Sequence, residues 1–454
     1  MEEQKALKEN KMGVMPIGKL LVTMSVPIML SMLVQAFYNV VDSIFVAQIN
    51  ENALTAVSLA FPVQNLMIAV ATGTGVGVNA LLSRALGAGD REYANKVANN
   101  GIMLAFFSYL VFVVFTALFA DFYYQVQTSN LQIIQYGNSY IKVIGMISFG
   151  MFFQIIFERL LQSTGMTLYT MVTQSLGAVI NIILDPIMIF GLLGFPKMGV
   201  AGAGLATVTG QIIAAILACV FNRKWNKEIR ISLKQYRLSG RVVAHIYSIG
   251  IPSIIMASVS SVMTFGMNKI LMMFTATATA VFGVYFKLQS FVFMPVFGLN
   301  NGLVPIVAYN FGARRPKRIV KTIKLSIIAA VSIMFMGFLI IQCIPAQLLR
   351  CFNASETMLS IGIPALKIIS LSFLFAGYCV ISSSVFQAFG HGVLSLLVSV
   401  LRQLIVLLPV AYLLSKIGGL SAIWWSFPIA EIFSVIICTT FLCYVYKKEV
   451  KPLY

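Results

Sequence analysis

Two aspartates interrupt apolar stretches of the sequence in a pattern that could bind and release a small ion. Asp42 lies in the run YNVVDSIFVAQI (38–49) and Asp185 in the run NIILDPIMIFG (181–191). A carboxylate inside a bilayer costs roughly 2.5 to 3.5 kcal/mol, so such a residue is a candidate functional site. Burial and a neighbouring carboxylate both favour the neutral acid, so a close pair of aspartates suits the binding of a proton or a cation.

The sequence around Asp185 adds further polar groups. Asn181 precedes Asp185 by one helical turn, so its amide can hydrogen-bond the carboxyl group. Pro186 has no backbone N–H, which leaves the Ile182 carbonyl without its helical partner and makes Pro186 a candidate hinge. If both runs are helices directed outward, they end near residues 49 and 192, and Asp42 and Asp185 both lie about 10 Å below the outer surface. We therefore expect one polar layer.

The elements that must hold these residues are long and apolar. Of 454 residues, 59% are hydrophobic and 10% are charged. A membrane-spanning helix needs roughly 20 apolar residues. The sequence offers twelve such stretches, at about 17–49, 53–83, 92–120, 131–158, 166–192, 199–222, 242–275, 278–308, 317–343, 357–389, 391–415 and 420–446. The sequence therefore predicts an all-α polytopic protein that lies in the lipid bilayer.

The positive charge is distributed unevenly along the chain. The formal net charge is +18, which could indicate a nucleic-acid partner. Most Lys and Arg residues lie at the two ends, in the linker 223–241 and in the other even-numbered loops, whereas Lys197, Arg350 and Lys416 lie in odd-numbered loops. This positive-inside pattern predicts that both termini are cytoplasmic, and that the protein is in the cytoplasmic membrane. We therefore expect no nucleic-acid partner.

An internal duplication divides the predicted spans into two sets of six. A constant spacing of 225 residues, which we call the repeat offset, relates the two halves. It relates Pro27 to Pro252, Gly87-Ala88 to Gly312-Ala313, and Gln162 and Gly165 to Gln387 and Gly390. Because six is an even number, both halves insert the same way, which implies a pseudo-twofold axis along the membrane normal. The predicted organisation is an N-lobe at 1–222, the basic linker at 223–241, a C-lobe at 242–446 and a cytoplasmic tail at 447–454.

Other polar residues within spans are candidates for a cavity or for structural roles. At the repeat offset Asp42 corresponds to Met267 and Asp185 to Val410, which favours a functional role for the aspartates over a structural one. We expect mid-span Arg402 and Glu431 to pair with each other. Candidate cavity residues, suited to soft and adaptable contacts, are Gln35, Tyr38, Asn39, Gln64, Gln154, Met188, Lys269, Lys287 and Gln289. The two lysines could equally extend to the membrane interface.

Several segments together resemble the MATE family, multidrug and toxic compound extrusion. They are YNVVDSIFVAQI, LQSTGMTLYTMVTQSLGAVINIILDPIMIFG, GVAGAGLATV, NNGLVPIVAYNFGAR and LRQLIVLLPVAYLL, and the resemblance covers nearly the whole chain. It implies a twelve-helix, two-lobe antiporter that exports organic cations in exchange for protons or sodium ions. It also implies that Asp42, Asn181, Asp185 and Thr207 form the ion-coupling site, and that Pro27 is a hinge in the first helix.

The expected function is export of small cationic, amphiphilic organic compounds by alternating access. Protons are the expected coupling ion, and sodium bound at Asp42, Asn181 and Asp185 is the alternative. The spans at 242–275 and 357–389 contain no Asp or Glu, so the N-lobe carboxyl layer must carry the coupling. Neither a cofactor nor a structural metal is expected, since six cysteines show no CxxC spacing and only two histidines occur. We expect a monomer.

Two other functions use the same residues differently. A flippase for lipid-linked saccharides or other amphiphiles would need a cationic cavity, in which Lys269, Lys287 and Arg402 would be the central residues. An intramembrane aspartyl protease would need two aspartates in one membrane layer. Asp185 is flanked by Leu and Pro rather than by a Gly-x-Gly-Asp motif, and the repeat would be unexplained, so we expect no enzyme.

Overall fold

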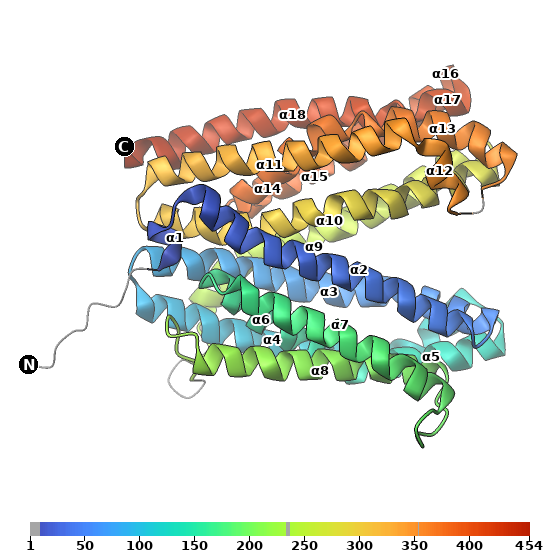
Figure 1. Cartoon of the computed structure of the whole chain (residues 1–454), viewed down its shortest axis with the longest axis horizontal. Helices are drawn as coiled ribbons and strands as arrows, with labels where there is room; N and C mark the ends of the chain where they lie inside the picture. The colour runs from blue at the N-terminus through green and yellow to red at the C-terminus, as the bar shows by residue number, and fades with distance from the viewer. Residues whose placement is uncertain (1–9, 233–236, 353) are drawn as a thin grey trace, which may run out of the picture. The chain divides into compact units, whose positions relative to one another are not determined.

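The computed structural model describes residues 10–232, 237–352 and 354–454, and every regular element in these ranges is helical. The helices of the first half are α1 (Lys11–Val14), α2 (Ile17–Ala47), α3 (Glu51–Gly87), α4 (Arg91–Gln127), α5 (Leu131–Met146), α6 (Phe149–Ser163), α7 (Thr167–Phe190) and α8 (Val200–Lys224). Figure 1 shows them as long rods that run back and forth. The predicted all-α fold is confirmed.

The second half repeats this pattern with more interruptions. Its elements are α9 (Gly240–Met272), α10 (Ala276–Gly312), α11 (Pro316–Cys343), α12 (Pro345–Arg350), α13 (Glu356–Ser370), α14 (Phe373–Ala388), α15 (Gly392–Val400), the π-helix η1 (Leu401–Leu407), α16 (Leu408–Ile417), α17 (Gly419–Ile423), α18 (Ser426–Val445), η2 (Tyr446–Val450) and η3 (Lys451–Leu453). In the described ranges, 10 helices are long and apolar enough to span a membrane, and two bent pairs raise the number to the predicted 12.

The two bent pairs occupy the same position in each half. α5 and α6 meet at 44°, and α13 and α14 meet at 49°. The first members begin at Leu131 and Glu356, which are related by the repeat offset. The fourth and tenth spans are therefore each broken near the middle, and the break belongs to the repeated unit. The sequence predicted one continuous span over 131–158 and another over 357–389, so neither break was predicted.

Helix starts are also repeated, although the residues that form them differ. Asn50 accepts a hydrogen bond from the Ala53 N–H at 2.8 Å, and Thr275 in the second half accepts one from the Ala278 N–H at 3.1 Å. The caps of α5 and α13 are Asn130 and Ser355, which the repeat offset also relates. Because the first N–H groups of a helix have no partner within it, these side chains define where each span begins. The repeated positions of the helix caps support the duplication even where the capping residues differ.

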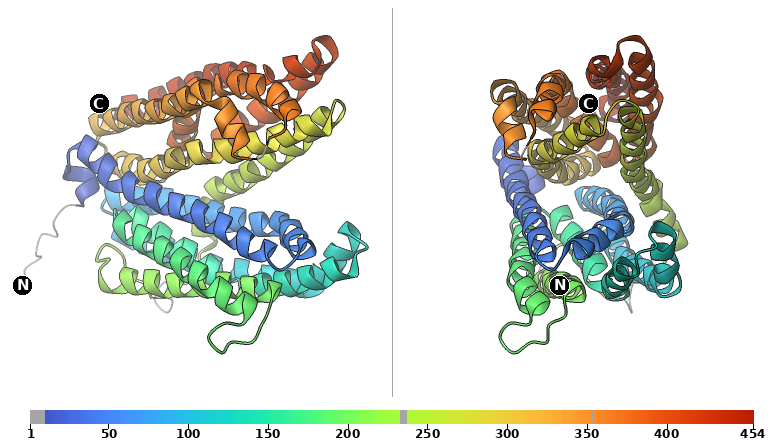
Figure 2. Two further views of the ribbon diagram at one scale, coloured as in Figure 1. Left: turned by 45° about the vertical axis from the view of Figure 1, so that its right-hand side comes forward. Right: turned by 90° about the vertical axis from the view of Figure 1, so that its right-hand side faces the viewer.

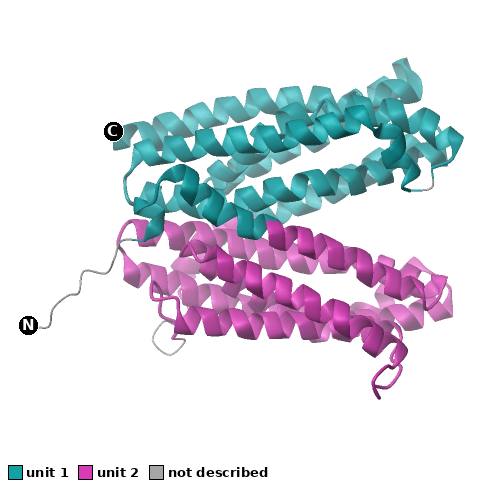
Figure 3. Cartoon of the chain, viewed as in Figure 1, with its two compact units in different colours: residues 1–29, 252–454 teal, residues 30–251 magenta. Residues whose placement is uncertain are grey.

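Contacts between helices group the chain into two compact units, residues 30–251 (unit 2) and residues 1–29 with 252–454 (unit 1). Figure 3 shows that α2 begins in unit 1 and ends in unit 2. α9 begins in unit 2 and ends in unit 1. The chain passes from one unit to the other between residues 29 and 30 and between residues 251 and 252, beside Pro27 and Pro252. The predicted lobes follow the order of spans rather than contacts, so that division stays a prediction; linker residues 233–236 lie outside the described ranges.

Glycines hold the first part of α2 closely against α10 within unit 1. A Cβ on Gly298 would lie 2.7 Å from the Met29 Cα, and one on Gly302 would lie 3.1 Å from the Ser25 Cα. The Ser25 hydroxyl also donates to the Leu299 carbonyl at 3.4 Å. Small residues four apart allow two backbones to approach in this way, and the close approach increases packing contact between helices in a membrane.

The same arrangement recurs in unit 2 between the first part of α9 and α3. A Cβ on Gly77 would clash with the Ile246 carbonyl, and one on Gly250 would lie 3.0 Å from the Gly73 carbonyl oxygen. The repeat offset relates Gly73 and Gly77 to Gly298 and Gly302. Each unit therefore holds the first part of a helix that ends in the other unit, by a repeated glycine contact.

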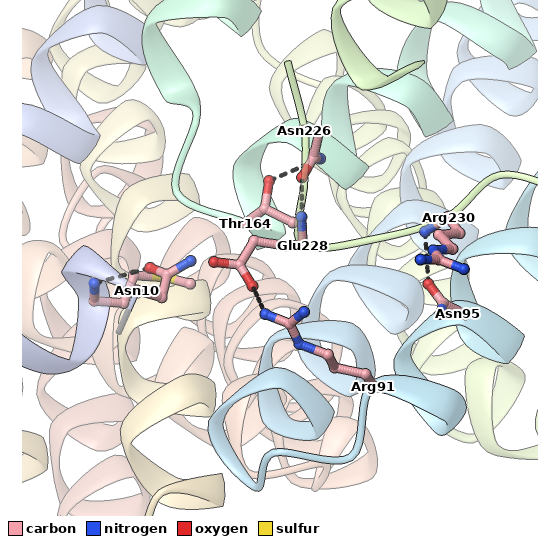
Figure 4. Close-up of polar contacts among 8 residues, drawn as sticks. Asn10, Arg91, Asn95, Thr164, Asn226, Glu228 and Arg230 are labelled. Carbon is pink, nitrogen blue, oxygen red and sulfur yellow. Dashed lines mark hydrogen bonds and ion pairs between the residues drawn. The ribbon is translucent and has the colours of Figure 1, made fainter. Parts of the chain in front are cut away.

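Asparagine side chains attach the linker to unit 2. Three of them, on α4, accept hydrogen bonds from linker backbone N–H groups: Asn95 from Arg230 at 2.7 Å, Asn99 from Ser232 at 2.8 Å and Asn100 from Ser239 at 2.8 Å. Figure 4 shows the Asn95–Arg230 contact and the ion pair of Arg91 with Glu228, which measures 3.4 Å. The described part of the linker is thus fixed to the unit that also contains the start of α9.

We predict that Gly77→Ala and Gly302→Ala each destabilise the protein. Alanine favours a helix over glycine by about 1 kcal/mol, but overpacking costs about 1 to 3 kcal/mol, so the added methyl group has a net unfavourable effect. Thermal unfolding of the purified protein in detergent measures this. Gly283→Ala, on α10, is the matched control because a Cβ there meets nothing within 4 Å. Equal melting temperatures for Gly77→Ala and Gly283→Ala would contradict the prediction.

Candidate functional site

The two predicted aspartates meet inside unit 2. Asp42 is carried by α2 and Asp185 by α7, and their carboxyl groups lie within hydrogen-bonding reach of each other. Asp185 is fully buried, and Asp42 is half-buried. One oxygen of each, Oδ1, is buried without a hydrogen-bond partner among the described residues. Two carboxylates this close cannot both carry a charge at low cost, so the pair needs a proton or a cation.

Asn181 and Thr207 connect Asp185 to the neighbouring helix α8. In the amide orientation that satisfies both ends of Asn181, Nδ2 donates to Asp185 Oδ2 at 3.2 Å and Oδ1 accepts from the Thr207 N–H at 3.0 Å. Figure 2 shows α7 and α8 side by side, which agrees with their extensive packing. Asn181 is 2% exposed, so its amide would be costly to leave unpaired. The expected Asn181–Asp185 contact is present.

The two proline positions lie within unbroken helices. Pro186 lies inside α7, which continues to Phe190 and ends at Gly191 with φ of 75°. Pro27 lies inside α2, one helix from Ile17 to Ala47. A proline removes one intrahelical hydrogen bond, so both positions are points of reduced backbone stability. Their roles as hinges stay predictions.

Two tyrosines adjoin the aspartate pair. The phenol of Tyr38, on α2, lies close enough to interact with the charge of both Asp42 and Asp185. Tyr140, on α5, lies near Asp42 and accepts a hydrogen bond from Gln64 Nε2 at 3.2 Å. Tyr38 and Gln64 were predicted from the sequence as cavity residues. Tyr140 was not predicted.

The other predicted cavity residues of unit 2 have different surroundings. Gln154 donates to Glu158 Oε1 at 3.0 Å, in a second polar group on α6. Met188 is 8% exposed, and its carbonyl accepts from the Met198 N–H at 3.0 Å, near the start of α8. Gln35 and Asn39 are exposed on α2. Their contact with a transported compound stays a prediction.

In unit 1, the four charged residues singled out from the sequence fall into two groups. Arg402 Nη1 and Glu431 Oε1 form an ion pair of 2.7 Å between η1 and α18, which is the expected mutual pairing. Lys269 and Lys287 are exposed, and each ammonium lies over an aromatic ring, that of Phe265 at 5.6 Å and that of Phe352 at 5.7 Å. Gln289 is half-buried.

The fold and the aspartate pair define a polytopic helical membrane protein with a pair of carboxyl groups inside one of its two units. The sequence matches the MatE family over residues 27–187 and 252–413. The chain therefore belongs to the MatE family, and the two matched segments correspond to its two halves.

Related proteins and solved structures agree with this assignment. The chain is 26% identical over 416 residues to a protein named "Multidrug export protein MepA" from Staphylococcus haemolyticus, covering 91% of each chain. It is 25% identical over 425 residues to the protein of the same name from Staphylococcus aureus, covering 92% of this chain and 91% of that one.

Two solved structures have the same fold. One, described as an outward-facing conformation of a multidrug resistance MATE family transporter of the MOP superfamily, aligns with a TM-score of 0.91 at 24% identity, over 98% of this chain and all of that one. Another is a MOP superfamily transporter from Pyrococcus furiosus whose binding pocket is described as having reverse polarity. It aligns with a TM-score of 0.89 at 23% identity, over 98% of this chain and 99% of that one. The likeness shows the twelve-helix, two-lobe fold.

We predict that Asn181→Leu destabilises the protein by about 1 to 3 kcal/mol, because a buried Asp185 oxygen then loses its donor. Thermal unfolding in detergent measures the change. Asn65→Leu, at an exposed position of α3, serves as the matched control. The loss should be smaller in a chain that already carries Asp185→Leu, since the acceptor is then absent. Equal losses in the two backgrounds would show that the Asn181–Asp185 contact is not the cause.

Proposed function

We propose that this protein is a multidrug exporter that exchanges cationic, amphiphilic organic compounds for protons, with sodium as the alternative coupling ion. The observation that carries this proposal is the meeting of Asp42 and Asp185 with one unpartnered buried oxygen each. The relatives named as multidrug export proteins support the class of function. The site supplies a reason for exchange, since one pair of oxygens can hold a small ion or face a larger cation.

The exchange follows from charge balance at the pair. When the proton leaves, the pair is negative and attracts an organic cation, whose charge would otherwise be costly to bury. The rings of Tyr38 and Tyr140 offer aromatic faces to such a cation beside the carboxyl groups. When a proton enters from outside, it cancels the negative charge and the organic cation loses its electrostatic partner. The same oxygens, with those of Asn181 and Thr207, are hard ligands of the kind that sodium prefers.

The membrane potential and the pH gradient can both power this exchange. Each net elementary charge that moves inward across 100 mV supplies about 2.3 kcal/mol. A tenfold concentration ratio requires about 1.4 kcal/mol, so each net charge moved inward maintains more than a tenfold gradient of the exported compound. A one-for-one exchange of a proton and an organic cation moves no net charge and is driven by the pH gradient alone. In this proposal the protein is a monomer in the cytoplasmic membrane with both termini in the cytoplasm.

We predict that an outward proton gradient, with the vesicle interior acidic, is sufficient for uptake of a fluorescent organic cation into inside-out vesicles. The gradients of pH and sodium are imposed separately, and uptake is followed by fluorescence. Uptake with the pH gradient alone supports proton exchange, and uptake with the sodium gradient alone supports the alternative. Uptake that is indifferent to both gradients would contradict the proposal.

Two isosteric substitutions, one at the site and one as its control, test which residue couples the exchange. Asp185→Asn removes one charge of the pair while retaining its shape, so cation-induced proton release from the vesicles should be abolished. Asp121→Asn changes an exposed aspartate that forms a 3.0 Å ion pair with Lys142, and should leave exchange intact. Comparable amounts of both variants in the membrane confirm folding. Wild-type exchange by Asp185→Asn would overturn the assignment of the site.

A further inference from the structure

A second buried carboxyl group lies on α6, and its surroundings differ from those of the aspartate pair. Glu158 is 3% exposed. Its Oε1 accepts from Gln154 Nε2 and from the Thr173 hydroxyl, both at 3.0 Å, and its Oε2 accepts from Gln174 Nε2 at 2.7 Å. All of these partners are donors, so both carboxyl oxygens accept hydrogen bonds. Both oxygens of Glu158 are thus occupied, whereas each aspartate of the pair has an oxygen without a partner.

The hydrogen bonds of Glu158 continue to α2. The amide oxygen of Gln174, on α7, accepts from the Ser31 hydroxyl at 2.5 Å. A continuous path of hydrogen bonds therefore runs from Glu158 on α6, through Gln174 on α7, to Ser31 on α2. We call it the α6–α7–α2 path. All three residues belong to unit 2. Ser31 is one turn after Pro27, just past the point where α2 enters this unit.

The path and the aspartate pair are in register along the same two helices. Ser31 precedes Asp42 by eleven residues on α2, and Gln174 precedes Asp185 by eleven residues on α7. Eleven residues are close to three helical turns, so both members of each pair lie on one helix face. The two contacts are about 16 Å apart along the helices. Because the two spacings are equal, α2 and α7 run in the same direction here. A displacement of one helix along the other at one contact therefore also displaces the second contact.

We propose that Glu158 is a positioning residue for the ion site: through Gln174 and Ser31, it fixes the register of α2 against α7 so that Asp42 meets Asp185. Three hydrogen bonds hold the Glu158 carboxyl group, so the path is anchored at its Glu158 end. Pro27 lacks the N–H that would stabilise α2 at the preceding turn, so the helix needs an anchor at this point. This role rests on the exchange function proposed above.

The test separates positioning from general stability by measuring protons released per organic cation transported, in vesicles. Ser31→Ala and Gln174→Leu should lower this ratio, because misaligned aspartates no longer share a proton. Ser31→Thr keeps the hydroxyl and should restore the ratio. Ser43→Ala is the matched control on α2, since that exposed hydroxyl bonds the Asn39 carbonyl of its own helix. A purely structural role would lower the amount of transporter but leave the ratio unchanged.

A second measurement does not depend on transport. Gln35 and Ala178 each lie one turn after the Ser31–Gln174 contact on their own helices. The rate at which a chain with Gln35→Cys and Ala178→Cys, and with its native cysteines replaced, forms a disulfide with a copper–phenanthroline oxidant therefore reports the register of α2 against α7. Glu158→Gln, which places an amide among donors, should slow cross-linking about tenfold, the scale of one or two lost hydrogen bonds. Asp185→Asn should not slow it.

The outcomes distinguish the two proposals. Absence of exchange by the wild-type protein would overturn the proposed function and leave the cross-linking result to decide the role of Glu158 in register. If the wild type exchanges, and Ser31→Ala and Gln174→Leu retain both the wild-type proton ratio and the wild-type cross-linking rate, the positioning role is wrong.

Discussion

The structure depends on one constraint, which is that two acidic side chains face each other inside an apolar helical unit. Asp42 and Asp185 are too close to be charged together at low cost, and each keeps a buried oxygen unpartnered. In the proposed exchange, a proton or a cation relieves this arrangement, and its departure restores it. Asn181 donates to Asp185 and accepts from Thr207 on α8, so contacts of α7 and α8 orient Asp185. Asp42 approaches it from α2.

The repeat separates what the fold needs from what the ion site needs. Helix caps, the breaks in the fourth and tenth spans, and the glycine contacts of α3 and α10 all recur at the repeat offset. The acids do not recur, since Met267 and Val410 occupy the corresponding positions. Both halves therefore use the same packing rules, and the carboxyl chemistry belongs to one of them. The second half instead carries the Arg402–Glu431 ion pair at unrelated positions, and its charges neutralise each other.

The sequence predicted the spans, the repeat and the aspartate pair because these follow from simple periodicities. An acid in a long apolar run is conspicuous, and a rise of about 1.5 Å per residue converts its position into a depth. Side-chain direction within a broken span does not follow in this way. The break between α5 and α6 resets the helical phase, so the common surroundings of Tyr140 and Asp42 could not be predicted, nor the contact of Gln154 with Glu158. The Ser31–Gln174 contact joins residues 143 apart in the chain, which no local sequence pattern indicates.

The most direct test of the central claim is to count protons released when a hydrophobic organic cation binds to the purified protein in weakly buffered detergent. Calorimetry measures the amount of cation bound and a pH indicator measures the protons released. Together they give the number of protons released per bound cation. We expect release of a proton with each bound cation, or displacement of bound sodium at a pH where the pair is already ionised. Binding that releases neither ion, with the same affinity when Asp42 and Asp185 are both replaced by asparagine, would contradict it.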